Sequence, residues 1–122
     1  MNYETWEKQT KNQETFSFFI LNKMKEEKIE STDFYKAADL TRDLFSKINC
    51  HRDYLPSKIT AIKCCLGLRL DISEAEYLLS LAGYSLSLSI PFDLAIRYCI
   101  ENQIFQVIEV NNFLFEKTDK TL

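Results

Sequence analysis

Glycine and proline are scarce in this chain, with only two of each in 122 residues. A sandwich or barrel of many short strands uses these residues at its turns, so the sequence argues against an all-β fold. Hydrophobic residues make up 46% of the chain and charged residues 27%, as in an ordinary globular protein. We therefore predict an all-α fold, in a chain long enough to bury one core.

Seven segments have apolar residues at helical spacing and are separated by short turn signals. Capping residues or a proline begin most of them, and Ser73 with Glu76 has the spacing of a capping box. Gly83 supplies a left-handed stop. The expected helices cover residues 15–28, 31–38, 41–50, 57–68, 73–82, 91–102 and 104–117.

Two segments do not fit this helical pattern. Residues 84–90, YSLSLSI, alternate apolar and hydroxyl side chains as a strand does, but a lone strand has no hydrogen-bonding partner in a helical chain, so we expect an extended connector. Residues 1–14 form either an arm or a frayed helix. The predicted organisation is this N-terminal segment, a bundle over 15–84, a connector and helices over 85–118 packed on the same domain, and a tail over 119–122.

Residues 31–49, STDFYKAADLTRDLFSKIN, have the layout of two short helices that cross steeply around a small core. The apolar positions of that core are Phe34, Ala38, Leu40, Phe45 and Ile48, and Ser46 is a serine within the second of the two helices. In these residues the segment resembles the Xre-type, lambda-repressor-like helix-turn-helix family, and the similarity spans about Phe16 to Gly83. The stretches LTRDLFSKIN, YLPSK and LLSLAGYSLS also resemble a helical module appended to bacterial macrodomain and other multidomain proteins. The resemblance implies a compact five-helix bundle, to which this chain adds two C-terminal helices.

This chain departs from the family pattern at two positions. Tyr35 stands where a small alanine is usual at a close helix contact, and its ring must rotate outward or push the helices apart. Asp39 stands where glycine is usual in the turn, and aspartate tolerates a left-handed conformation better than most residues.

Charge is distributed unevenly along the chain. The whole chain has a net charge of -3, whereas residues 41–69 contain six basic residues and two acidic ones, a net of +4. A basic segment in an acidic protein fits a nucleic-acid footprint, but a solvated helix face explains the same pattern.

The resemblance implies a non-enzymatic regulator whose third helix, about residues 41–50, enters the major groove of duplex DNA or contacts structured RNA. Arg42 is the candidate for a base contact, although it could instead pair with Asp39 or Asp43, and Asp43 repels phosphate. The residues expected at bases or phosphates are Thr41, Arg42, Ser46, Lys47, His51, Arg52, Ser57 and Lys58.

The C-terminal segment is more apolar than one packed face requires, which suggests a homodimer or partner surface. Its candidate residues are Phe105, Ile108, Phe113 and Phe115. The alternative function is a protein-interaction adaptor, or a small bacterial or phage inhibitor, built on the same scaffold.

Other chemistry has little support in the sequence. One histidine, no glycine-rich phosphate loop and no H-E-x-x-H motif leave common enzyme sites incomplete, so we expect no catalytic residues, no metal and no cofactor. The four cysteines are expected to be buried reduced thiols. No apolar run is long enough to span a bilayer and the N-terminus lacks a secretory pattern, so a cytoplasmic location without membrane contact is expected.

Overall fold

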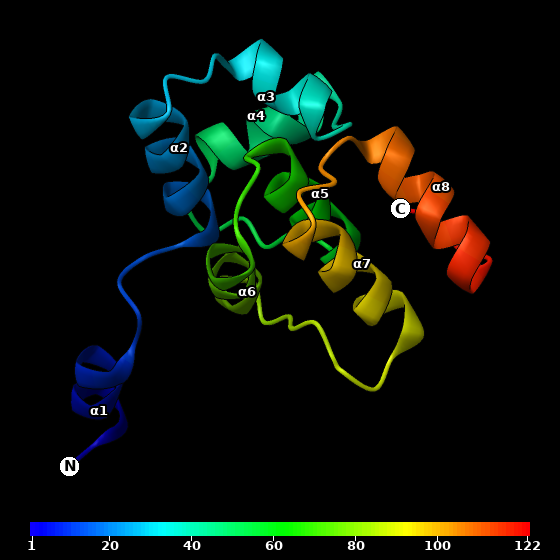
Figure 1. The fold of residues 1–122 in the computed structure, drawn as a ribbon. Coiled ribbons are helices and arrows are strands. Elements are labelled where there is room, and N and C mark those ends of the chain that lie inside the picture. The colour runs from blue at the N-terminus through cyan, green and yellow to red at the C-terminus, as the bar shows by residue number, and fades with distance from the viewer.

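A computed structural model describes residues 1–122 as an all-α fold without strands (Figure 1). The eight helices are α1 (Tyr3–Thr10), α2 (Phe16–Glu26), α3 (Ser31–Ala37), α4 (Arg42–Cys50), α5 (Lys58–Gly67), α6 (Ile72–Leu81), α7 (Pro91–Glu101) and α8 (Val107–Thr118). The all-α prediction is confirmed, and residues 84–90 form an irregular connector rather than a strand.

Side-chain caps fix where several helices begin. The hydroxyls of Thr15, Thr41 and Ser57 each accept a hydrogen bond from a backbone N–H three residues later, which satisfies a free donor of the first turn. The capping box at α6 consists of Asp71 and Glu74, so its prediction at Ser73 and Glu76 was wrong by two residues. An aspartate carboxylate accepts the same hydrogen bond from a backbone N–H as a serine hydroxyl does. Asp71 is the N-cap because the chain is still extended at this residue.

Five helices end with the same left-handed cap, although the chain has only two glycines. In each case the residue with positive φ precedes an apolar residue, whose N–H bonds to the carbonyl five residues back in a Schellman motif. The left-handed and apolar residues are Lys28 and Ile29, Asp39 and Leu40, Arg69 and Leu70, Gly83 and Tyr84, and Gln103 and Ile104. The apolar residue of each pair packs against the core or lies within it, so tertiary packing stabilises a conformation that Lys, Arg and Gln rarely adopt.

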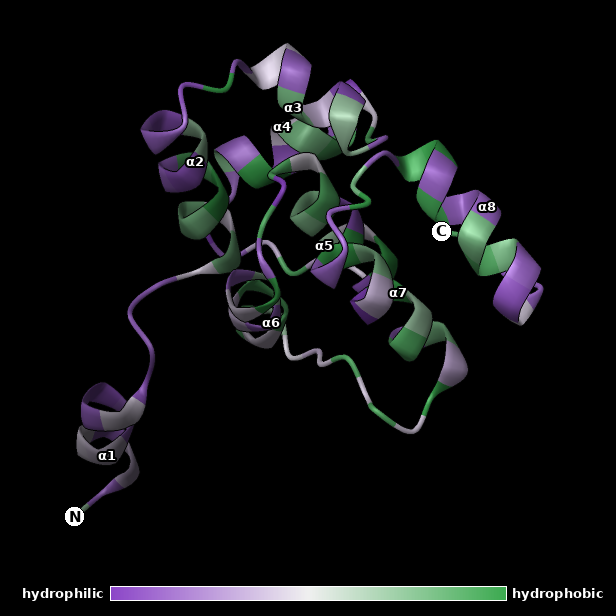
Figure 2. Ribbon diagram, in the orientation of Figure 1, coloured by the Kyte–Doolittle hydropathy of each residue, from purple (hydrophilic) through white to green (hydrophobic).

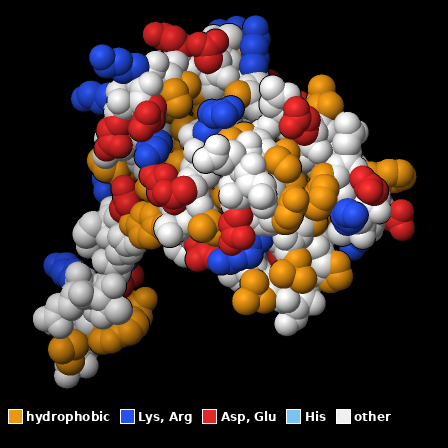
Figure 3. Space-filling view, viewed as in Figure 1, with side chains coloured by type: hydrophobic (Ala, Val, Ile, Leu, Met, Phe, Trp, Pro, Cys, Tyr) orange, Lys and Arg blue, Asp and Glu red, His pale blue; other side chains and the backbone are white.

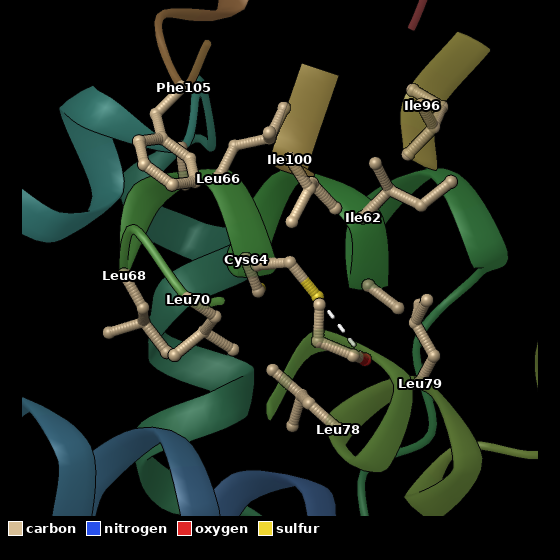
Figure 4. Close-up of a cluster of buried hydrophobic side chains, with 14 of the residues drawn as sticks. Ile62, Cys64, Leu66, Leu68, Leu70, Leu78, Leu79, Ile96, Ile100 and Phe105 are labelled. Carbon is tan, nitrogen blue, oxygen red and sulfur yellow. Dashed lines mark hydrogen bonds between the residues drawn. The ribbon is translucent and has the colours of Figure 1, made fainter. Parts of the chain in front are cut away.

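Helix α5 lies at the centre of one continuous hydrophobic core. Six of the seven residues from Cys64 to Leu70, at the end of α5 and directly after it, are buried, and only Arg69 is exposed. Figure 4 shows Leu66 beside Phe105 on one side of α5 and Leu78 and Leu79 of α6 on another. The hydrophobic faces of the surrounding helices turn toward this element (Figure 2).

The local core between α3 and α4 is built as the sequence predicted. Phe34, Ala38, Leu40, Phe45 and Ile48 are all buried, and the Phe34 and Phe45 rings meet edge to face at 5.7 Å. Helix α3 ends closely against α5, because a Cβ added at Gly67 would lie 2.7 Å from the Cβ of Ala38. This crossing orients α3 on the core.

The two departures from the family pattern have separate outcomes. Asp39 adopts a φ of 56°, so it fills the left-handed turn position as predicted. Tyr35 is half-buried, and its ring lies 5.8 Å from that of Phe45. The ring is therefore not rotated fully into solvent but packs beside α4, the second helix of the pair.

The C-terminal helices pack on the same core as the first six. Ile96, Ile100, Val110 and Leu114 of α7 and α8 belong to the single buried cluster. Helix α1 is different, because none of its residues is buried and it projects from the bundle (Figure 1). The N-terminal segment is thus a helical arm.

Candidate nucleic-acid interface

The outer face of α4 is uncovered along its whole length. Phe45 and Ile48 point into the core, and Leu44 is half-buried beside them. The remaining α4 residues are exposed and polar or thiol-bearing, namely Arg42, Asp43, Ser46, Lys47, Asn49 and Cys50. The amphipathic pattern of α4 therefore leaves one polar side free to meet a partner.

Three basic or titratable residues gather at the C-terminal end of α4. Lys47, His51 and Arg52 line one open hollow of about 510 Å³, together with Asp53 and Tyr54. Neither Lys47 nor Arg52 makes a salt bridge, and both are exposed. The hollow therefore presents two unpaired cations against one carboxylate.

A buried serine fixes this end of α4 to the bundle. The Ser17 hydroxyl on α2, only 2% exposed, donates a hydrogen bond of 3.2 Å to the carbonyl of His51. The bond anchors the loop that carries His51 and Arg52. Sequence reasoning missed Ser17, because a serine on an apolar helix face gives no indication of a partner 34 residues away.

Arg42 lies at the N-terminal end of the same exposed face. Its guanidinium forms no salt bridge with Asp39 or Asp43, the two alternatives that the sequence left open. Asp39 instead accepts a hydrogen bond from Lys63 at 3.3 Å. Arg42 is therefore free to contact a ligand, although exposed Asp43 beside it opposes an anion.

The caps at Thr41 and Ser57 use side chains that were also expected near phosphate. The Thr41 hydroxyl accepts from the Leu44 N–H at 3.1 Å, and the Ser57 hydroxyl accepts from the Thr60 N–H at 3.1 Å. The Ser57 hydroxyl also lies 3.1 Å from the Thr60 hydroxyl. Both residues remain exposed, but their hydroxyls hold helix ends within the chain.

Lys58 is directed into the protein rather than toward a ligand. Its ammonium contacts both carboxylate oxygens of Asp93 at 2.8 and 2.9 Å, and Asp93 is only 2% exposed. Asp93 also accepts the Ser87 N–H at 2.8 Å. The pair joins the start of α5 to α7 and the connector before it, so Lys58 does not offer phosphate the free ammonium that the sequence analysis expected.

The six basic residues of 41–69 therefore do not form one patch. Lys58 and Lys63 are neutralised by Asp93 and Asp39, and the Arg69 guanidinium lies 4.9 Å from the centre of the Phe105 ring. The three that surround the exposed face of α4 are Arg42, Lys47 and Arg52.

The residues expected at a partner surface lie in different environments. Phe105 is buried beneath Arg69, so its prediction as an exposed partner residue was wrong. Phe113 is half-buried and stacks on Tyr98 at 5.0 Å, whereas Ile108 and Phe115 are 76% and 60% exposed. Phe105 faces inward because the turn before α8 brings it onto Leu66 of α5 (Figure 4).

Burial separates the cysteines into two groups. Burial raises the pKa of the Cys65 thiol to about 12 and that of Cys99 to about 11, and it raises the pKa of Cys64 well above its ordinary value. Cys50 is exposed on α4, so the expectation of burial was wrong for this residue. No group of three His, Cys, Asp or Glu side chains is placed to hold a metal ion.

A scan against protein-family models, a search of curated proteins and a search of solved structures each returned no match. None of the eight helices combines the length and apolar character that a membrane span requires.

Proposed function

We propose that this chain is a non-enzymatic helix-turn-helix regulator that binds nucleic acid through α4. The observation that carries the proposal is the uncovered polar face of α4, which presents Arg42 and Lys47 without ion-pair partners and continues into Arg52. Two short helices in sequence, with the second exposed, are the arrangement that places a helix in the major groove.

Each residue near α4 has a distinct role in this proposal. Arg42, at the N-terminal end of α4, is placed for a base edge, where its planar fork matches the two acceptors of guanine. Lys47 and Arg52 contact phosphate, with His51 and Ser46 beside them. Duplex DNA is the expected target, and structured RNA is the alternative. A dimer would double the few base contacts that one short helix offers.

Salt dependence tests this proposal directly. Lys47→Ala with Arg52→Ala should lower duplex affinity by about tenfold at moderate salt and reduce the slope of log K against log salt by about 2, because two phosphate contacts are lost. The control is Lys117→Ala with Lys120→Ala, which removes two exposed cations at the far end of the chain, one of them paired with Glu116. The measurement is fluorescence anisotropy of a labelled duplex at several salt concentrations.

A double variant that keeps the wild-type affinity and slope would contradict the assignment of these residues. Arg42→Ala should in addition lose about 1–3 kcal/mol of binding free energy and discriminate less between sequences.

One observation favours the second candidate, a protein-interaction adaptor or small bacterial or phage inhibitor. Large apolar side chains are exposed on and beside α7 and α8, namely Leu88, Ile90, Leu94, Tyr98, Ile108 and Phe115. Figure 3 shows hydrophobic side chains gathered on part of this side of the molecule. Absence of duplex and RNA binding at low salt, with a protein partner whose capture needs Ile108 and Phe115, would support this candidate instead.

A further inference from the structure

Helix α1 lacks the packing that normally stabilises so short a helix. It has eight residues, none of them buried, and an isolated helix of this length is marginal in water. Its sequence YETWEKQT includes tyrosine, threonine and tryptophan, which are weaker helix formers than alanine or leucine. Asn2 caps its first turn by accepting the Thr5 N–H at 2.9 Å, but one cap contributes only about 1 kcal/mol. A surface on another molecule would supply the missing burial.

One side of α1 is both aromatic and acidic. The Tyr3 and Trp6 rings lie 6.0 Å apart and are 64% and 51% exposed. The Tyr3 hydroxyl donates to the Glu7 carboxylate at 3.5 Å, so this carboxylate lies on the same side as the rings. Figure 3 shows the hydrophobic side chains along the projecting arm.

A groove with the complementary character lies where α3 and α5 end against the start of α8. Its volume is about 430 Å³, and exposed Ala37 and Ile108 provide apolar lining around the buried side chains of Leu66, Phe105 and Val107. Lys36 and Arg69 also line it, are exposed and form no salt bridge, whereas the carboxylate in the lining, Asp39, is paired with Lys63.

We propose that α1 of one copy docks in this groove of a second copy. Tyr3 and Trp6 cover the apolar lining, and the acidic side of α1 faces Lys36 and Arg69 of the other copy. Association buries both apolar surfaces and pairs opposite charges, which also sets the orientation of α1. The proposal stands independently of nucleic-acid binding.

The arm cannot reach the groove of its own chain. Helices α1 and α8 lie on opposite sides of the molecule (Figure 1), and only residues 11–15 connect α1 to α2. Five extended residues span at most about 18 Å. The connector is also tied down, because the Tyr77 hydroxyl donates to Glu14 at 2.6 Å. Reciprocal exchange of α1 between two copies closes the contact into a dimer.

Trp6 is the only tryptophan of the chain and reports on the docking directly. Its emission should shift to shorter wavelength, and acrylamide quenching should fall, as the full chain is concentrated from about 1 μM to about 1 mM. Sedimentation velocity should place dimer formation in the same concentration range. Trp6→Ala should abolish the dimer without changing the thermal unfolding midpoint of the dilute chain, at about 1 μM, since Trp6 contacts no core residue.

Charge reversal tests the choice of groove. Lys36→Glu with Arg69→Glu should weaken self-association by at least about tenfold, and adding Glu4→Lys with Glu7→Lys should restore part of it. The matched control is Lys117→Glu with Lys120→Glu. The proposal is overturned if the emission and quenching of Trp6 do not change with protein concentration, whether the ring is exposed or protected throughout. It is equally overturned if Lys36→Glu with Arg69→Glu leaves dimer formation unchanged.

Discussion

Lys58→Met is expected to lower the free energy of unfolding by about 3 kcal/mol at neutral pH, because it leaves the Asp93 carboxylate buried without its counter-ion. The Ser87 N–H still donates to Asp93, but one neutral donor does not replace an ammonium that contacts both oxygens. The pair joins α5 to α7 and to the connector before it. Urea denaturation followed by circular dichroism gives the measurement.

Removing the carboxylate instead of the ammonium should lower the free energy of unfolding by less. This asymmetry identifies the uncompensated buried charge as the cause of the loss. In Asp93→Asn the Lys58 ammonium can turn into solvent, since its side chain is 31% exposed, so we expect a loss of about 1–2 kcal/mol. The double variant should be more stable than Lys58→Met alone, because neither group is then charged. Equal costs for the two single variants would show that lost packing, and not an uncompensated charge, dominates.

Gly67→Ala is expected to destabilise the fold by about 2 kcal/mol, although alanine is the better helix former. The new Cβ would lie 2.7 Å from the Ala38 Cβ and 3.1 Å from the Ala38 Cα and N, so α3 must move away from α5. The helix-propensity gain of about 1 kcal/mol offsets only part of this overpacking. Thermal and urea unfolding of the variant check the sign.

A double-mutant cycle separates this contact from other effects of Gly67. In a chain that already carries Ala38→Gly, adding Gly67→Ala should lower the free energy of unfolding by less than about 1 kcal/mol. The Ala38 Cβ, the atom closest to the new methyl group, is absent from that chain. If Gly67→Ala leaves the free energy of unfolding unchanged both in the wild-type chain and in the Ala38→Gly chain, α3 and α5 can move apart without loss of stability.

The helices were predictable from the sequence because their information is local. The spacing of Phe34, Ala38, Phe45 and Ile48 identified two crossing helices, and all four side chains are buried. The turn at Asp39 was also predictable, since aspartate adopts the left-handed conformation more readily than most residues.

Other helix ends could not be predicted from residue type. Lys28, Arg69 and Gln103 carry no left-handed signal, and only the apolar residue that follows each of them indicates a Schellman cap. The sequence feature that could have found these caps is the recurring step from a polar residue to an isolated apolar one at the end of a helical pattern.

The candidate interface was only partly accessible to sequence reasoning. The outward direction of Arg42 and Lys47 follows from the amphipathic pattern of α4, which is local. The engagement of Lys58 by Asp93 depends on packing between segments 35 residues apart, and no spacing rule reports it. For the same reason, the net charge of residues 41–69 overestimated the charge that the surface presents.

Mapping the surface of the isotopically labelled chain that contacts a short duplex tests the central claim most directly. At low salt, the largest amide chemical-shift changes should fall on residues 41–52, which comprise Thr41, α4 and the loop with His51 and Arg52. The amides of α7 and α8 should remain unshifted. The absence of shifts at low salt, or shifts confined to α7 and α8, would contradict α4 as a nucleic-acid-binding helix.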